Sequence, residues 1–333
     1  MEQQTIVPKK LKLQIMVGIL CFALALIFPL IFQDYIIHVG IITLLYALLA
    51  VSWNIIGGYG GMMSFGQAAF YGIGAYTSTI LLLNWNLSPW IGMLIGGIFS
   101  AILGLIMGYL CFHFKLRGWY FGLVTMAFGD LFLVMATNFF PGQAAGLYLP
   151  LSEREWYHFQ FAKKIPYYYI ILSFLLVSLL IAYLIERSRI GYYLRAIRED
   201  EDVAESLGVY LMKYRLIAFS ISGFFTAIGG TFFAQYLLFI DPNMVFSMDK
   251  TIEIVIRALV GGMGTLWGPV LGSLFLTPLG EIFNVFLGEQ KGLHLVFYGI
   301  ILVVFIMYVP HGLLNLIRRS LRRGKTLRKG DIE

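Results

Sequence analysis

Charged side chains are scarce in this chain, at 13% of its 333 residues, which is about half the share that a soluble domain usually carries. Hydrophobic residues make up 59%. A chain of this length would be long enough for two soluble domains, but so apolar a composition is typical of chains that lie in a lipid bilayer. The composition therefore argues against a soluble protein and predicts several membrane spans.

Cysteine is rare as well, with Cys21 and Cys111 as the only two. Both lie in or at the end of an apolar segment, where a thiol usually behaves as a small buried hydrophobic group. The chain has no disulfide framework or metal-ligand spacing, and no GxGxxG or P-loop motif. We therefore expect no metal, no cofactor and no catalytic residue in this chain, which leaves a membrane enzyme as the least favoured class.

Ten apolar segments are candidate membrane spans, since a spanning helix needs ~20 mostly apolar residues; glycine and proline interrupt the pair at 251–287. Backbone polar groups in hydrocarbon need partners within the protein, so each segment is expected to be helical. The sequence thus predicts an all-α polytopic bundle that forms a single domain over residues 1–333. The ten segments are 13–33, 36–56, 62–83, 90–112, 118–139, 166–186, 214–236, 251–264, 269–287 and 293–313.

Lysine and arginine are distributed unevenly over the loops. With both termini in the cytoplasm, 18 of the 24 fall on that side and 5 on the other, as the positive-inside rule requires. We therefore expect both termini inside, and interpret the net charge of +6 as a topology signal rather than a sign of nucleic-acid binding. The hydrophilic parts are an outside loop at 140–165, an inside segment at 187–215 and a basic tail at 314–333 that would lie against lipid headgroups.

Glycine, in contrast, is abundant, and the stretch from Trp53 to Tyr76 is especially rich in it. Glycine permits positive φ and close helix contact, so we expect a tight inside turn there. A weak echo, Val260–Gly264 against Ile56–Gly60, is typical of transporters built from repeats, although two independent turns would look the same. Polar residues nearby would either join helices or line a path. The predicted path and hinge residues are Asn54, Gly57, Gly58, Gly61, Ser64, Gly66, Gln67, Thr125, Gly261, Gly262 and Gly264.

Four ionisable residues fall inside the predicted spans: Asp130, Glu253, Arg257 and Glu281. A charge near the bilayer centre costs at least ~2.5–3.5 kcal/mol on insertion scales. Arg257 is therefore expected to extend toward the cytoplasm or to pair with one of the three carboxylates. A role in the path is the second interpretation.

The inside segment predicts one amphipathic helix, from about Tyr193 to Leu207. Ile197, Ala204 and Leu207 would share one face, and Gly208 follows where a left-handed C-cap is expected. Such a helix can lie on lipid or dock into the groove of a partner. The residues assigned to it are Arg195, Ile197, Arg198, Glu199, Ala204, Glu205, Leu207 and Gly208.

Four segments together resemble the LivM-type permease of branched-chain amino acid ABC importers. They read GYGGMMSFGQAAFYGIGAY at 58–76, LRGWYFGLVTMAFG at 116–129, RIGYYLRAIREDEDVAESLG at 189–208 and VGGMGTLWGPVLG at 260–272. The resemblance implies a prokaryotic inner-membrane permease subunit whose inside helix inserts into an ATPase. It also implies four partners: a homologous second permease, two ATPase subunits that hold ATP and magnesium, and an extracytoplasmic substrate-binding protein.

The sequence departs from the family pattern in several places. The family commonly has histidine at the position of Gln67 and glutamine at that of Met62, and an apolar residue where Arg257 stands. The outside loop reads Gly142-Gln-Ala-Ala-Gly146, without the polar residue that the family often carries there. Leucine, isoleucine and valine are the substrates that the resemblance implies, with urea or short amides as the alternative. A stand-alone secondary carrier or channel is a further alternative, which would not need the inside helix.

Overall fold

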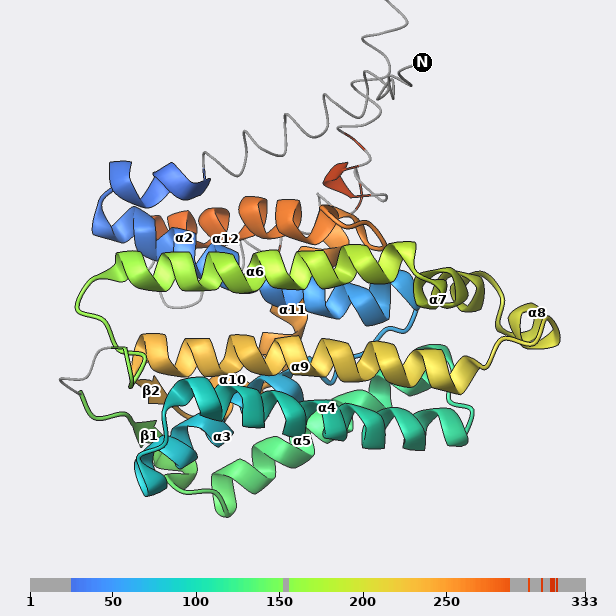
Figure 1. Ribbon diagram of the computed structural model, residues 1–333, viewed down its shortest axis with the longest axis horizontal. Coiled ribbons are helices and arrows are strands. Elements are labelled where there is room, and N and C mark those ends of the chain that lie inside the picture. The colour runs from blue at the N-terminus through green and yellow to red at the C-terminus, as the bar shows by residue number, and fades with distance from the viewer. Residues whose placement is uncertain are drawn as a thin grey trace, which may run out of the picture.

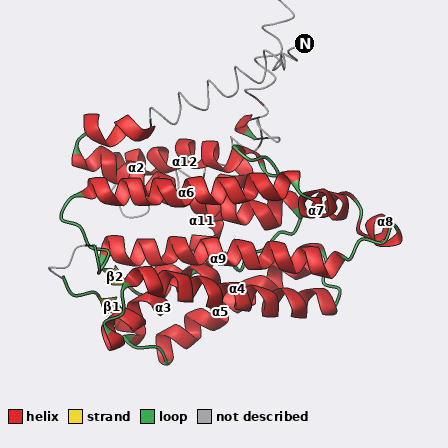
Figure 2. Cartoon of the chain, in the orientation of Figure 1, coloured by secondary structure: helices red, strands yellow, loops and turns green. Residues whose placement is uncertain are grey.

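The computed structural model describes residues 25–151 and 156–287, together with 299, 307, 312–314 and 316. Long helices run side by side along the molecule (Figure 1), and the only regular elements besides helices in this part of the chain are two very short strands (Figure 2). The predicted all-α class is confirmed. The elements are α2 (Asp34–Asn54), the π-helix η1 (Ile55–Tyr59), α3 (Gln67–Trp85), α4 (Pro89–His113), α5 (Gly118–Asn138), the 3-10 helix η2 (Gln143–Ala145), β1 (Leu147–Tyr148), α6 (Lys164–Arg187), α7 (Arg189–Glu199), α8 (Glu201–Ser206), α9 (Leu211–Leu237), β2 (Phe239–Ile240), α10 (Pro242–Phe246), α11 (Met248–Gly262) and α12 (Gly268–Leu287).

Five of the described helical stretches are long and apolar enough to cross a membrane: Asp34–Tyr59, Pro89–His113, Gly118–Asn138, Lys164–Arg187 and Leu211–Leu237. They confirm a polytopic membrane protein. The predicted spans 62–83, 251–264 and 269–287 correspond to α3, α11 and α12, although α11 with 15 residues is only ~22 Å long and too short to cross by itself. The predicted spans 13–33 and 293–313 lie largely outside the described residues.

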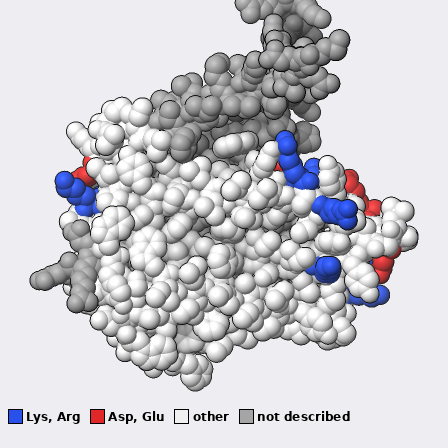
Figure 3. Space-filling view, viewed as in Figure 1, with Lys and Arg blue, Asp and Glu red and all other residues white. Residues whose placement is uncertain are grey.

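The distribution of charge fits this architecture. In the view of Figure 3, lysine, arginine, aspartate and glutamate side chains gather at the two ends of the long axis, and the face between them shows uncharged residues. The long helices run parallel to that axis (Figure 1). A bilayer can therefore surround the middle of the bundle, with the charged helix ends in water.

The helix that begins with α2 does not end in an ordinary turn. It continues as the five-residue π-helix η1, and residues 61–66 have no regular structure before α3 begins at Gln67. The prediction of a span from residue 62 was therefore wrong by five residues at this end. Such irregular backbone is tolerated at membrane depth only where it is buried in protein or lines a cavity.

Small residues let α3, α4 and α9 approach closely. A Cβ atom at Gly74 would lie 2.0 Å from the carbonyl oxygen of Ala227, and one at Gly230 would lie 1.9 Å from that of Tyr71. Larger side chains would push these backbones apart. Gly74 therefore lies on a small-residue packing face of α3, and Gly72 of the same helix packs against the ring of Phe246.

The inside segment is not the single helix that its sequence predicts. It forms α7 and α8, which are separated at Asp200, where φ is −157° and ψ is 116°. The carboxylate of Asp200 accepts hydrogen bonds from the backbone N–H groups of Asp202 and Val203. Aspartate favours this N-cap role over a position inside a helix, so the chain breaks there and starts a new helix. Both helices project beyond the ends of the spans (Figure 1).

Candidate functional site

The two glycine turns that the sequence singled out lie against each other. Asn54 joins them: its Nδ2 atom donates to the carbonyl oxygen of Thr265 at 3.0 Å, and its Oδ1 atom accepts from the backbone N–H of Gly264 at 2.8 Å. A Cβ atom at Gly58 would lie 2.6 Å from the backbone nitrogen of Gly264. The two echoing segments therefore form one contact, although their descent from a repeat stays a prediction.

Helix α7 is attached to this contact through Arg198. Its Nη1 atom donates to the carbonyl oxygen of Gly58 at 2.8 Å. Gly61 and Gly264 both have positive φ, +68° and +76°, and a Cβ atom on either would lie within 2.6 Å of the Arg198 side chain. We call this set the inner junction: Asn54, Gly58, Gly61, Arg198 and Gly264. It brings together predicted path residues and a predicted coupling residue that are far apart in sequence.

The other predicted hinge glycines serve close packing. A Cβ atom at Gly57 would meet the ring of Trp53 at 2.4 Å, and one at Gly261 would lie 1.8 Å from the carbonyl oxygen of Gly268. Gly262 has a φ of +124°, and a Cβ atom at Gly66 would lie against Met107 and Thr125. These contacts explain why glycine is needed at each position, and a hinge motion stays a prediction.

The polar residues of the predicted path are buried and hydrogen-bonded within the chain. Gln67 donates to Ser222 Oγ at 3.2 Å and accepts from Thr226 Oγ1 at 2.8 Å. Thr125 Oγ1 accepts from the backbone N–H of Phe65 at 3.0 Å, and the Ser64 hydroxyl accepts from that of Gly66. Gln67 thus joins α3 to α9 by helix–helix hydrogen bonds, whereas Ser64 and Thr125 bond to the irregular segment at 61–66, and a role of these residues in a path stays a prediction.

The intramembrane arginine does not pair with a carboxylate as expected. Arg257 lies with its guanidinium carbon 3.7 Å from the centre of the Tyr46 ring, and it donates to the backbone carbonyl oxygen of Glu253 at 2.6 Å and to Thr277 Oγ1 at 3.1 Å. An aromatic face and two oxygen acceptors replace an ion pair because the Glu253 carboxylate is held by Lys250 at 3.2 Å and by the Tyr46 hydroxyl.

The other two acidic residues in the spans behave differently. Among the described residues, neither Asp130 nor Glu281 takes part in an ion pair. Glu281 is half-buried on α12, whereas Asp130 is exposed on α5. A carboxylate that faces outward from an apolar span requires protein or water beside it rather than lipid.

Two residues of the predicted coupling face turn inward. Ile197 and Ala204 are both only 2% exposed, whereas Leu207 is 78% exposed and lies near the exposed Val203 and Tyr210. The prediction that Ile197, Ala204 and Leu207 share one docking face was wrong, because the break at Asp200 turns α8 relative to α7. We call the exposed apolar group Val203, Leu207 and Tyr210 the α8 tip.

The other residues assigned to this segment hold it in place or lie in solvent. Arg195 donates to the carbonyl oxygen of Glu186 at 2.6 Å, and Glu199 forms an ion pair with Arg198 at 3.3 Å. Glu205 is exposed. Gly208 has the predicted positive φ, +83°, with no atom within 4 Å of the position that a Cβ would occupy, which confirms its expected conformation.

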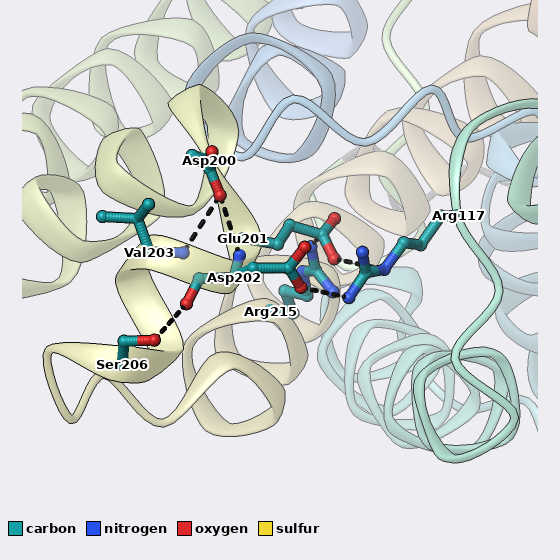
Figure 4. A network of polar contacts seen from close by, with 7 residues as sticks. All are labelled: Arg117, Asp200, Glu201, Asp202, Val203, Ser206 and Arg215. Atoms are coloured by element: carbon teal, nitrogen blue, oxygen red, sulfur yellow. Dashed lines mark hydrogen bonds and ion pairs between the residues drawn. The ribbon is translucent and has the colours of Figure 1, made fainter.

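An ion-pair network at α8 escaped the sequence analysis (Figure 4). Arg117 Nε lies 3.0 Å from Glu201 Oε2 and Arg117 Nη2 lies 2.9 Å from Asp202 Oδ1, while Arg215 pairs with the other oxygen of Glu201. The hydrogen bond from Arg117 lowers the pKa of the Asp202 carboxyl below its usual value. The acidic run at 200–202 was a signal, but its partners lie at the start of α5 and in α9, and the sequence does not say which basic residues meet it.

Together these features define a class of protein. A bundle of membrane helices contains an interrupted helix, whose irregular backbone is packed against a second glycine turn, and an exposed inside segment is bonded to that junction. This is the architecture of a membrane transport permease. The chain belongs to the family described as the permease component of the branched-chain amino acid transport system, whose model matches residues 35–306.

Individual relatives agree with this assignment. The chain is 27% identical over 332 residues to the high-affinity branched-chain amino acid transport system permease protein LivM of Escherichia coli strain K12, covering 92% of this chain and 76% of the relative. It is 25% identical over 314 residues to a probable LivM of Methanocaldococcus jannaschii, covering 81% and 90%.

A further relative resembles only part of the chain. The autoinducer 2 import system permease protein LsrC of Klebsiella pneumoniae is 33% identical over 122 residues, which is 34% of this chain and 35% of that protein. No solved structure matches the chain.

Proposed function

We propose that the chain is the membrane-spanning permease subunit of an ATP-driven importer for leucine, isoleucine and valine, and that it forms half of the translocation path. The observation that carries the mechanism is the hydrogen bond from Arg198 to the carbonyl oxygen of Gly58. It connects the inside segment, which a partner can reach, to the interrupted helix within the bundle. The family and its LivM relatives support the substrate class.

The α8 tip is the surface proposed to bind an ATPase subunit. Val203, Leu207 and Tyr210 are 55%, 78% and 78% exposed, and acidic residues surround them. A short helix that presents apolar side chains with a charged rim fits a hydrophobic groove in a partner protein. Two such ATPase subunits, which bind ATP and magnesium, would complete the importer with a homologous second permease and an extracytoplasmic substrate-binding protein.

Movement of the ATPase subunits would reach the path through α7. Leu194 and Ile197 are buried, at 0% and 2% exposure, so α7 is packed firmly enough to move as one body. Its Arg198 holds the turn at Gly58, which in turn contacts Gly264. A displacement of α7 would therefore act on both glycine turns together, as alternating access around a fixed path requires.

The proposed topology has about ten spans in a prokaryotic inner membrane with both termini in the cytoplasm. The charge bias of the loops supports it, and so does the concentration of charged side chains at the two ends of the molecule in Figure 3. In this orientation α7 and α8 are cytoplasmic. The short strands β1 and β2, paired through Leu147 and Ile240, would then lie outside, where a substrate-binding protein would dock.

Purification of the tagged chain from its native membrane in mild detergent, followed by mass spectrometry, tests this function first. We expect an ATPase pair and a second glycine-rich permease to co-purify. The purified complex in proteoliposomes, with the binding protein added, should take up labelled leucine upon addition of ATP. Uptake of labelled urea in place of leucine would move the substrate to short amides. Recovery of the chain alone, in a detergent that preserves a known ABC complex, would contradict the proposal.

A further inference from the structure

Four charged residues fasten α8 to two different membrane helices (Figure 4). We call Arg117, Glu201, Asp202 and Arg215 the α8 clamp. Glu201 lies between the two arginines: Arg117 Nε is 3.0 Å from its Oε2 atom and Arg215 pairs with its Oε1 atom. Arg117 also reaches Asp202 Oδ1 at 2.9 Å. A planar guanidinium with several fixed donors can hold two carboxylates in this way, which a lysine ammonium cannot reproduce.

The two arginines come from helices that are embedded to very different degrees. Arg215 lies in the first turns of α9, where its side chain is 8% exposed and its guanidinium stacks 5.3 Å from the ring of Phe112. In its most apolar stretch α9 is 72% buried, the highest share among the five candidate spans. The Arg215 contact is therefore an anchor in the most firmly packed part of the bundle.

Arg117, in contrast, belongs to a helix that is only weakly embedded in the bundle. It is the N-cap residue of α5 and has extended backbone angles, φ −125° and ψ 155°. The most apolar stretch of α5 is only 28% buried, against 44–72% in the other four spans. Gly118, which follows, has a φ of +57° and no atom within 4 Å of a Cβ position. The clamp thus joins α8 to a helix that the rest of this chain holds only loosely.

Helix α5 also contacts the irregular segment at 61–66. Thr125 Oγ1 accepts a hydrogen bond from the backbone N–H of Phe65 at 3.0 Å, and a Cβ atom at Gly122 would lie 3.1 Å from the carbonyl oxygen of Met63. Any shift of α5 is therefore passed to the backbone between the inner junction and α3. The face of α5 that carries the exposed Asp130 must meet protein or water for the reason given above, and not lipid alone.

We propose that Arg117 is a positioning residue that transmits the displacement of α8 to α5 and thereby to the segment at 61–66. This inference rests on the proposed function, because an ATPase subunit supplies the displacement. The importer then has two mechanical connections from its inside segment: Arg198 acts on the inner junction, and Arg117 acts on α5. Because α9 is packed more firmly in the bundle than α5, a movement of α8 is expected to shift α5 relative to α9.

The test uses the complete importer in proteoliposomes, with ATP hydrolysis and leucine uptake measured on the same sample. Arg117→Asp removes both contacts of the guanidinium. We expect this variant to assemble with its ATPase subunits and to hydrolyse ATP, while uptake per ATP falls roughly two- to five-fold, the range that suits the loss of exposed charge contacts. Arg117→Lys should fall between the wild type and this variant. Arg117→Gln serves as the measured variant if Arg117→Asp does not assemble.

A charge exchange separates a positioning role from a merely structural one. Arg117→Asp combined with Asp202→Arg reverses one pair and leaves the Glu201–Arg215 pair in place, so uptake per ATP should recover at least in part. Arg189→Asp is the matched control, because Arg189 is an exposed arginine of the same inside region without a role in the clamp. It should leave uptake per ATP unchanged.

Three results would overturn the inference: unchanged uptake per ATP in the Arg117 variants, an equal loss in Arg189→Asp, or no recovery on charge exchange. A loss of assembly in parallel with the loss of uptake in every Arg117 variant would make the clamp structural and would also overturn it. Failure of the wild-type chain to bind an ATPase at all is a different outcome, since it would contradict the proposed function itself.

Discussion

Replacing Gly264 with alanine tests the inner junction most directly. Gly264 has a φ of +76°, and the added Cβ would lie 2.6 Å from Arg198 Nη1 and 3.1 Å from the carbonyl oxygen of Gly58. Left-handed backbone costs an alanine about 1–2 kcal/mol. The new methyl group should also displace Arg198 from Gly58. That charge-assisted bond, with the Arg198 side chain 33% exposed, is worth about 1–2 kcal/mol after allowance for solvent. The expected loss of stability is thus about 2–4 kcal/mol.

Gly208→Ala is the matched control for this substitution. Gly208 also has positive φ, +83°, but no atom lies within 4 Å of its Cβ position, so the control carries only the backbone cost of about 1–2 kcal/mol. Thermal unfolding of the purified chains in detergent, followed by fluorescence, compares the two. Gly264→Ala should unfold at the lower temperature by several degrees.

A double-mutant cycle with Arg198→Ala assigns the difference to the arginine. If Gly264→Ala acts by displacing Arg198, the two substitutions together should destabilise by less than the sum of their separate effects. Equal unfolding temperatures for Gly264→Ala and Gly208→Ala, or strictly additive effects in the cycle, would refute the argument that Arg198 holds the junction.

Three further predictions address the coupling segment and the junction. Gly208→Val should insert normally but uncouple ATP hydrolysis from uptake, because a β-branched residue resists positive φ; ordinary coupling would contradict the proposed role of α8. Asn54→Leu leaves a buried backbone donor and acceptor without their partner, so it should lower stability by about 2–4 kcal/mol, and an unchanged unfolding temperature would count against the junction. The pKa of Asp202 is lowered from 3.8 by Arg117, so its pair contributes stability above about pH 4 that is lost only as pH falls through the still lower folded-state pKa. The difference in uptake per ATP between wild type and Arg117→Gln should therefore stay constant from about pH 8 to about pH 5, and a loss of that difference within this range would show that another group controls the clamp.

The break at Asp200 shows where local sequence rules reach their limit. The run from Tyr193 to Leu207 has a helical pattern, and Gly208 was placed correctly as its C-terminal glycine. The acidic residues at 200–202 equally suit the start of a helix. Asp200 takes the N-cap role in the structure, where Arg117 and Arg215 hold the next two acidic residues from other segments. The sequence was compatible with one continuous helix and with a new helix that starts at Asp200. The structure has the second, together with tertiary contacts to the acidic residues of the new helix.

The intramembrane charges illustrate the same limit. Sequence reasoning found that Arg257 needs a partner, because an unpaired charge in a span is costly. It proposed a carboxylate as the partner of Arg257, since carboxylates are the usual partners of arginine. The choice of the Tyr46 ring and Thr277 depends on how α2, α11 and α12 pack, and no local pattern encodes that packing.

By itself the sequence determined the membrane class, five of the ten predicted spans, the two glycine-rich segments and the conformation of Gly208. Each follows from a property of a short stretch of chain: its apolar length, its content of glycine, or its tolerance of positive φ. Only the tertiary structure decided that Arg198 reaches Gly58 and that Arg117 reaches Asp202, pairs separated by 140 and 85 residues. Contacts at such distances depend on how whole helices pack, so they are properties of the folded bundle and not of any one segment.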